Sequence, residues 1–215
     1  TALAISKLMS TYGFDLNKWR DLAIACGIIV FPMLLIIGQK ETGSALVYSA
    51  FFLMLYREGM TGSFLFTGVA LIIYFIVGIR FADVQLWDMP ASVGKFSVLL
   101  MVHIFTAALV DIYCHDRQRA LIVLYTTLGT TLIAILFSEY VIHFDIVWVQ
   151  LFLSVLVIGY LIYTGLEWRI KEYFFITLFA VGSIAFFYSA DYVLNNVMQP
   201  HQRVRINVLL GLEED

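Results

Sequence analysis

A short basic stretch near the C-terminal end of the chain is the first feature with obvious chemistry. Arg203 and Arg205 flank one valine, and Gln202 stands directly before them. Arginine forks match phosphate oxygens in both geometry and charge. Pro200 before the pair and Gly211 after it frame one short helix. The stretch predicts either a phosphate-binding site or an interfacial helix whose arginines contact lipid head groups.

A second polar stretch, residues 39–46, lies between two apolar runs. Gly43 permits a tight turn and leaves the next helix N-terminus open, where free N–H groups attract anions. Glu41 stands just before it, where a carboxylate is favoured. Two interpretations remain: a polar functional site that includes Glu41, or a hairpin turn in which Thr42 or Ser44 caps the helix.

Two polar features lie inside apolar runs. His103 is the only ionisable residue well inside one, which makes it a functional candidate. No acidic residue occupies the centre of another run, so we favour a structural role, in which a neutral ring bonds a backbone carbonyl or a neighbouring threonine. Small residues at helical spacing favour close helix packing in another run: Thr126, Thr127, Gly129, Thr130 and Thr131.

The composition identifies the medium that surrounds these residues. Of the 215 residues, 61% are hydrophobic and 13% are charged, against about 25% charged in an ordinary soluble domain. This excludes a soluble enzyme and a disordered protein. The net charge of −3 provides no basic field, which excludes a nucleic-acid-binding module. Cys26 and Cys114 are too far apart in sequence to suggest a metal motif.

Continuous apolar runs predict an all-α fold, a polytopic transmembrane helical bundle. Residues 1–190 form the membrane region, and residues 191–215 begin a large extracytoplasmic loop that contains the short helix. Residues 1–12 also have a helical pattern. The run at 43–56 is the shortest of about seven predicted spans, which are 21–38, 43–56, 62–79, 93–110, 120–137, 146–163 and 173–190.

Basic residues at the ends of these spans indicate the orientation. One set of alternate loops holds Lys18, Arg20, Arg57, Arg117, Arg119, Arg169 and Lys171, and the other holds only Lys40, Arg80 and Lys95. Because cytoplasmic loops are enriched in lysine and arginine, the first set is predicted to face the cytoplasm. Residues 39–46 and 191–215 then both lie outside.

These two outer stretches, in this order, resemble the SEDS family of cell-wall polymerases, the RodA, FtsW and SpoVE proteins. Residues 39–46, QKETGSAL, are similar to the Q-P-D-x-G-[ST]-x-[IL] signature, with Lys40 in place of proline and Glu41 in place of aspartate. Residues 201–205, HQRVR, with Leu209 and Leu210, resemble the Y-Q-R-x-R…L stretch that opens the family's outer loop. The residues of these two motifs are most similar to those of RodA. A typical member has two spans between the motifs, whereas this chain has about six.

The resemblance implies a peptidoglycan glycosyltransferase that polymerises lipid II into glycan strands in the bacterial inner membrane, for cell elongation and shape. The implied partner is a class B penicillin-binding protein, a transpeptidase. The resemblance implies that Glu41, Gln202, Arg203 and Arg205 bind substrate. Glu41 is also the candidate ligand for a divalent cation, the only cofactor in view. The family's catalytic aspartate lies downstream of Asp215, so no catalytic residue falls in this chain.

We therefore expect an internal fragment of a longer enzyme, with about four extra spans, that is inactive alone. Two other functional classes stay open. A membrane transporter or lipid flippase would place His103 on a translocation path through discontinuous helices. A membrane scaffold would use the extra spans to dock a partner.

Overall fold

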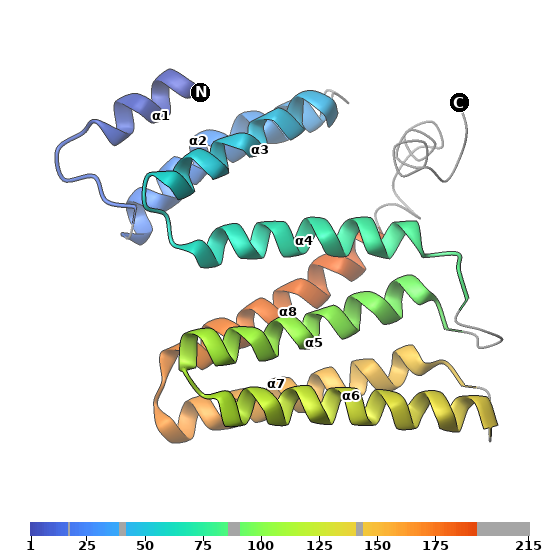
Figure 1. Ribbon diagram of the computed structural model, residues 1–215. Coiled ribbons are helices and arrows are strands. Elements are labelled where there is room, and N and C mark those ends of the chain that lie inside the picture. The colour runs from blue at the N-terminus through green and yellow to red at the C-terminus, as the bar shows by residue number, and fades with distance from the viewer. Residues whose placement is uncertain (17, 39–41, 86–90, 141–143, 193–215) are drawn as a thin grey trace. The chain divides into compact units, whose positions relative to one another are not determined.

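The computed structural model describes residues 1–16, 18–38, 42–85, 91–140 and 144–192 (Figure 1). The all-α prediction is confirmed for this part of the chain, whose only β-type pairing is an isolated bridge between Gln85 and Ser92. Its helices are α1 (Ala2–Met9), α2 (Trp19–Gly38), α3 (Thr42–Arg57), α4 (Gly62–Arg80), α5 (Val93–Cys114), α6 (Arg117–Tyr140), α7 (Ile146–Trp168) and α8 (Lys171–Tyr192).

A helix occurs at each of the seven predicted spans. Within the described residues, the five helices α4 to α8 are long and apolar enough to cross a membrane, with mean hydropathies of 1.7 to 2.2 over their most apolar stretches. The chain therefore has the character of a multi-pass membrane protein. α3 has only 16 residues, fewer than the roughly 20 that a bilayer requires. α2 is not among the five, and the count of seven spans stays a prediction.

The chain divides into two compact units, Thr1–Ala70 and Leu71–Asp215. In the first unit, α2 packs against both α1 and α3. Its core includes Ile5 from α1, Ile29 from α2 and Leu55 from α3, all fully buried. These aliphatic contacts hold the three helices together.

The second unit contains the four-helix bundle α5–α8. α5 packs against α6, α7 and α8, and α7 packs against α6 and α8. Leu99, Ala134 and Ile146 form part of a buried cluster shared by α5, α6 and α7. Apart from the buried hydroxyl of Tyr74 in α4, the buried polar side chains of the described residues lie in this bundle. The bundle therefore holds most of the polar groups inside the described membrane helices.

Two tight turns shape the bundle. α5 and α6 are joined by His115 and Asp116, and α7 and α8 by Arg169 and Ile170. His115 and Arg169 are each the C-cap of the preceding helix and adopt left-handed conformations, with φ of 52° and 54°. A left-handed residue reverses the chain directly after a helix. Both hairpins therefore reverse the chain through a left-handed residue at the end of the first helix.

Candidate functional site

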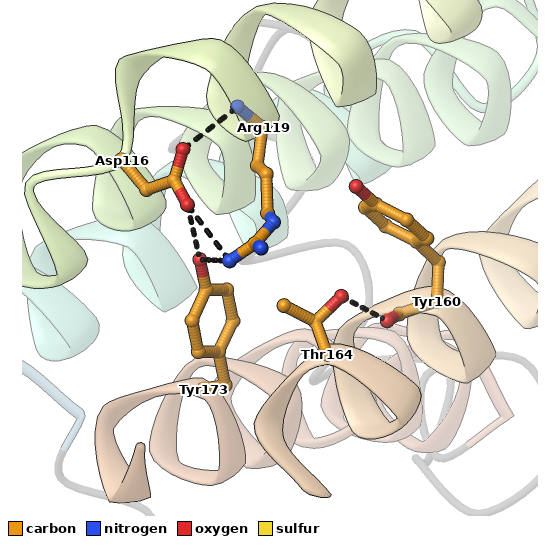
Figure 2. Close-up of polar contacts among 5 residues, drawn as sticks. All are labelled: Asp116, Arg119, Tyr160, Thr164 and Tyr173. Carbon is orange, nitrogen blue, oxygen red and sulfur yellow. Dashed lines mark hydrogen bonds and ion pairs between the residues drawn. The ribbon is translucent and has the colours of Figure 1, made fainter. Parts of the chain in front are cut away.

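The first polar cluster of the bundle lies at the turn between α5 and α6 (Figure 2). Oδ1 of Asp116 accepts a hydrogen bond from the backbone N–H of Arg119 at 3.1 Å, which caps α6. Oδ2 of Asp116 lies 2.8 Å from Nη1 of Arg119 in an ion pair. A carboxylate at a helix N-terminus is favoured by both the free N–H groups and the helix dipole. Asp116 thus stabilises the start of α6 in two ways.

Tyr173 of α8 completes this cluster. Its side chain is fully buried, and its hydroxyl donates to Oδ2 of Asp116 at 3.2 Å. Nη1 of Arg119 in turn donates to the Tyr173 hydroxyl at 3.3 Å. Figure 2 shows these three groups pointing toward one another, with Tyr160 and Thr164 of α7 beside them. The cluster ties the first turn of α8 to the turn between α5 and α6.

The guanidinium of Arg119 also lies over an aromatic ring. Its central carbon is 4.6 Å from the centroid of Trp168, the last residue of α7. An arginine over an indole face gains cation–π attraction. Arg119 thus contacts the turn before its own helix, the end of α7 and the first turn of α8. These contacts place the two hairpin turns at the same end of the bundle. The basic residues of both turns belong to the set of loops predicted to face the cytoplasm, and that prediction also requires both turns at one end of the bundle.

A second polar cluster lies midway along the bundle, around His103. The ring is buried, with Nδ1 at 2.7 Å from the carbonyl oxygen of Leu99 and Nε2 at 3.2 Å from Oγ of Ser154. Because a carbonyl oxygen only accepts, Nδ1 carries the proton, and in the neutral ring Nε2 accepts from the Ser154 hydroxyl. Oγ of Ser154 also lies 2.8 Å from the Gln150 carbonyl oxygen. One hydroxyl proton is therefore shared between two acceptors.

Gln150 extends the cluster from α7 to α6. Its Nε2 donates to Oγ1 of Thr131 at 2.6 Å, and that hydroxyl donates to the Thr127 carbonyl oxygen at 2.6 Å. The other amide atom, Oε1, is buried without a partner among the described residues. An unsatisfied buried acceptor costs about 1–3 kcal/mol. The Gln150 amide is therefore a weak point of the cluster around His103.

The threonines of α6 divide between two faces. Thr127 and Thr131 are buried in the bundle, whereas Thr126 and Thr130 are exposed. Each of the four hydroxyls donates to a carbonyl of its own helix. The packing role predicted for this stretch holds for the buried pair. The described residues contain no group of three or more histidine, cysteine, aspartate or glutamate side chains that could hold a metal ion.

The substrate-binding residues predicted from sequence all lie outside the described residues: Glu41, Gln202, Arg203 and Arg205. The short helix predicted after Pro200 lies there as well. The structure neither brings these residues together nor separates them. His103, by contrast, makes the carbonyl bond expected for a structural histidine, with a serine as its side-chain partner.

Several residues of these clusters were not predicted from the sequence, among them Asp116, Tyr173 and Ser154. Arg119 was predicted only to mark the cytoplasmic side. The aspartate directly before the basic start of a span is a helix-cap signal that could have been noticed. No comparable signal marks Tyr173 or Ser154, because tyrosine and serine are common in membrane helices.

Comparisons with known proteins return no match. No family model, no curated protein and no solved structure is similar to the chain.

Proposed function

We propose that this chain is part of a RodA-like integral membrane peptidoglycan glycosyltransferase of the bacterial cytoplasmic membrane, which polymerises lipid II for cell elongation and shape. The observation that carries the proposal is the pair of polar stretches at 39–46 and 201–210, which resemble two motifs of one family in the family's order. Either stretch alone would be a weak indication, and the pair is more specific.

The order of helices supports the proposal. Between residue 41 and residue 193 the described chain forms α3 to α8 in succession. Five of these six helices, α4 to α8, are long and apolar enough to cross a membrane. If the shorter α3 crosses as well, an even number of crossings separates the two stretches. Both then lie on one face, as a shared outer substrate site requires. Four spans more than the usual two would leave this relationship intact.

The proposed chemistry assigns a role to each predicted residue. A sugar hydroxyl attacks the anomeric carbon of a chain linked to lipid pyrophosphate, and the pyrophosphate leaves. Arg203 and Arg205 would stabilise the charge of the leaving group, and Gln202 would contact the same substrate. Glu41 would shape the polar cavity and is the candidate ligand for a divalent cation. The general base would lie beyond Asp215, and a class B penicillin-binding protein would cross-link the product.

Lipid II polymerisation by the full-length protein tests the site assignment. We expect Arg203→Ala, Arg205→Ala and Glu41→Gln each to lower the rate, because each removes a charge from the substrate site. Arg57→Ala is a matched control, since its side chain is 84% exposed and it belongs to the opposite set of loops. Rates near wild type in all three site variants would reject these residues as the substrate site.

Translocation of a lipid or solute is the second candidate function. The buried cluster of His103, Ser154, Gln150 and Thr131 favours it, because polar groups deep inside a membrane bundle often mark a pathway. A path would make Ser154→Cys reactive toward a water-soluble thiol reagent in the membrane. The described helices α4 to α8 lack internal proline and are continuous, which favours the polymerase.

A further inference from the structure

A groove lies between α7 and α8 on the surface of the bundle. Its volume is about 360 Å³, and its walls are mainly aliphatic side chains such as Val155 of α7 and Val181 and Ala185 of α8. Two polar side chains also line it, Ser154 and Tyr188. The groove is therefore lined mainly by apolar side chains, with two polar residues among them.

The sides of the groove face outward, whereas its floor is internal. Val155 is 65% exposed and Val181 is 44% exposed, but Ser154 is only 4% exposed. Both helices belong to the five that are apolar and long enough to span a membrane. In a bilayer, the medium on the open side of the groove is hydrocarbon, so an occupant must be compatible with acyl chains.

The groove has a polar end and an apolar end. Tyr188 stands one turn before the end of α8, the end at which α7 begins. Its hydroxyl is buried without a hydrogen-bond partner among the described residues, and it interacts electrostatically with Asp145 and Asp191. Ser154 lies further along α7, toward the middle of the span. This polarity fits an amphiphile whose head group lies at the Tyr188 end.

The size of the groove distinguishes between occupants. A transmembrane helix about 10 Å across and about 30 Å long has several times the volume of the groove, which is about 360 Å³. A single acyl chain is a much smaller occupant and suits this volume. We propose that the α7–α8 groove binds a single acyl chain of a membrane phospholipid lengthwise, with the ester region near Tyr188 and the chain over Ser154.

A bound chain would have a consequence for the polar core. Ser154 lines the groove, and its hydroxyl also contacts Nε2 of His103. Hydrocarbon over Ser154 would keep water from the hydrogen bond between Ser154 and His103, which is stronger in a dry environment. This role depends only on the helices lying in a membrane and is independent of the proposed reaction.

Native mass spectrometry of the chain, released from nanodiscs of palmitoyl-oleoyl phosphatidylethanolamine, tests the proposal. We expect wild type to retain one phospholipid. Ala185→Phe places a ring in the groove and displaces several methylene groups, so occupancy should fall by about tenfold. Thr130→Phe on the exposed face of α6 is the control, because it adds a ring away from the groove. It should retain the lipid.

A second measurement covers the case in which Ala185→Phe fails to fold. A spin-labelled stearoyl phospholipid added to wild type should show an immobilised component, and Val155→Phe, which changes an exposed wall residue, should reduce it. Equal lipid retention or equal immobilisation in wild type and groove variants would overturn the proposal. Crosslinking of Val155→Cys to another protein chain, with no retained lipid, would also overturn it.

Discussion

The hydroxyl of Tyr173 donates a hydrogen bond of 3.2 Å to Oδ2 of Asp116, so that a buried side chain of α8 holds the turn between α5 and α6. The same carboxylate oxygen pairs with Nη1 of Arg119 at 2.8 Å. Removing any member of this triad takes one polar partner away from each of the other two. Removing the hydrogen bonds of the buried tyrosine should lower the free energy of unfolding more than removing the partly exposed ion pair.

Replacing Tyr173 by phenylalanine should therefore destabilise the bundle. The ring stays in place, but Asp116 loses a donor and Arg119 loses an acceptor, which costs about 1–2 kcal/mol. Thermal unfolding in detergent would measure this. Tyr163→Phe is the matched control, because Tyr163 is 63% exposed, and it should leave the midpoint unchanged. Equal midpoints for both variants would contradict a stabilising role for the triad.

Two substitutions of Asp116 should separate its role as the cap of α6 from its ion pair with Arg119. Asp116→Asn keeps an oxygen that caps α6 but loses the ion pair with Arg119, whereas Asp116→Ala loses both. We expect alanine to cost about 1 kcal/mol more than asparagine, the usual value of an N-cap. Chemical unfolding in mixed micelles would give the difference. If the two variants are equally stable, the cap makes no contribution.

The Gln150–Thr131 pair should behave asymmetrically. Thr131→Val leaves the Gln150 amide without its acceptor and should cost about 1–3 kcal/mol. Gln150→Met removes the unpartnered Oε1 together with the amide, so it should be close to neutral. In the Gln150→Met background Thr131→Val should cost much less, which a double-mutant cycle detects. Thr130→Val, one residue away and exposed, serves as control.

Two glycines should respond in opposite directions to alanine. A methyl group at Gly94 would lie 2.5 Å from the backbone oxygen of Gly78, so Gly94→Ala should cost about 1–3 kcal/mol through overpacking. A methyl group at Gly129 of α6 meets no atom within 4 Å. Gly129→Ala should therefore stabilise the helix by about 0.5–1 kcal/mol. The sign of each change in unfolding free energy is the readout.

Glycine should be tolerated at the left-handed turn residues. His115 has φ of 52° and is exposed, and this conformation disfavours residues with a Cβ atom. We expect His115→Gly to raise stability by about 0.5–1 kcal/mol. Tyr113→Gly, two residues earlier inside α5, should lower it by about 1 kcal/mol. A loss of stability in His115→Gly would show that the imidazole makes a contact that outweighs the strain.

Hydropathy placed the helices well, because a membrane helix must be apolar over most of its length. The predicted span at 93–110 lies within α5, which runs from Val93 to Cys114. The predicted ends are short because polar residues such as Asp111 belong to the last turn of the helix although they interrupt the apolar run. The last span shows the same difference, since its apolar run ends at Ala190 whereas α8 extends to Tyr192.

Contacts between helices could not be predicted in the same way. The partner of His103 is Ser154, 51 residues away, and that of Asp116 is Tyr173, 57 residues away. Which faces of two helices meet depends on packing, and the sequence of a helix that is apolar all round gives no face preference. The stretches around Glu41 and Arg203 were identified from their resemblance to family motifs, and the substrate site that they would form stays a prediction.

The two short turns of the bundle bear on how the protein enters its membrane. Only His115 and Asp116 separate α5 from α6, and only Arg169 and Ile170 separate α7 from α8. With so little chain between them, the second helix of each pair cannot remain in water while the first is already buried. Each hairpin should therefore be inserted as one unit during synthesis, with its basic turn kept on the side of the ribosome.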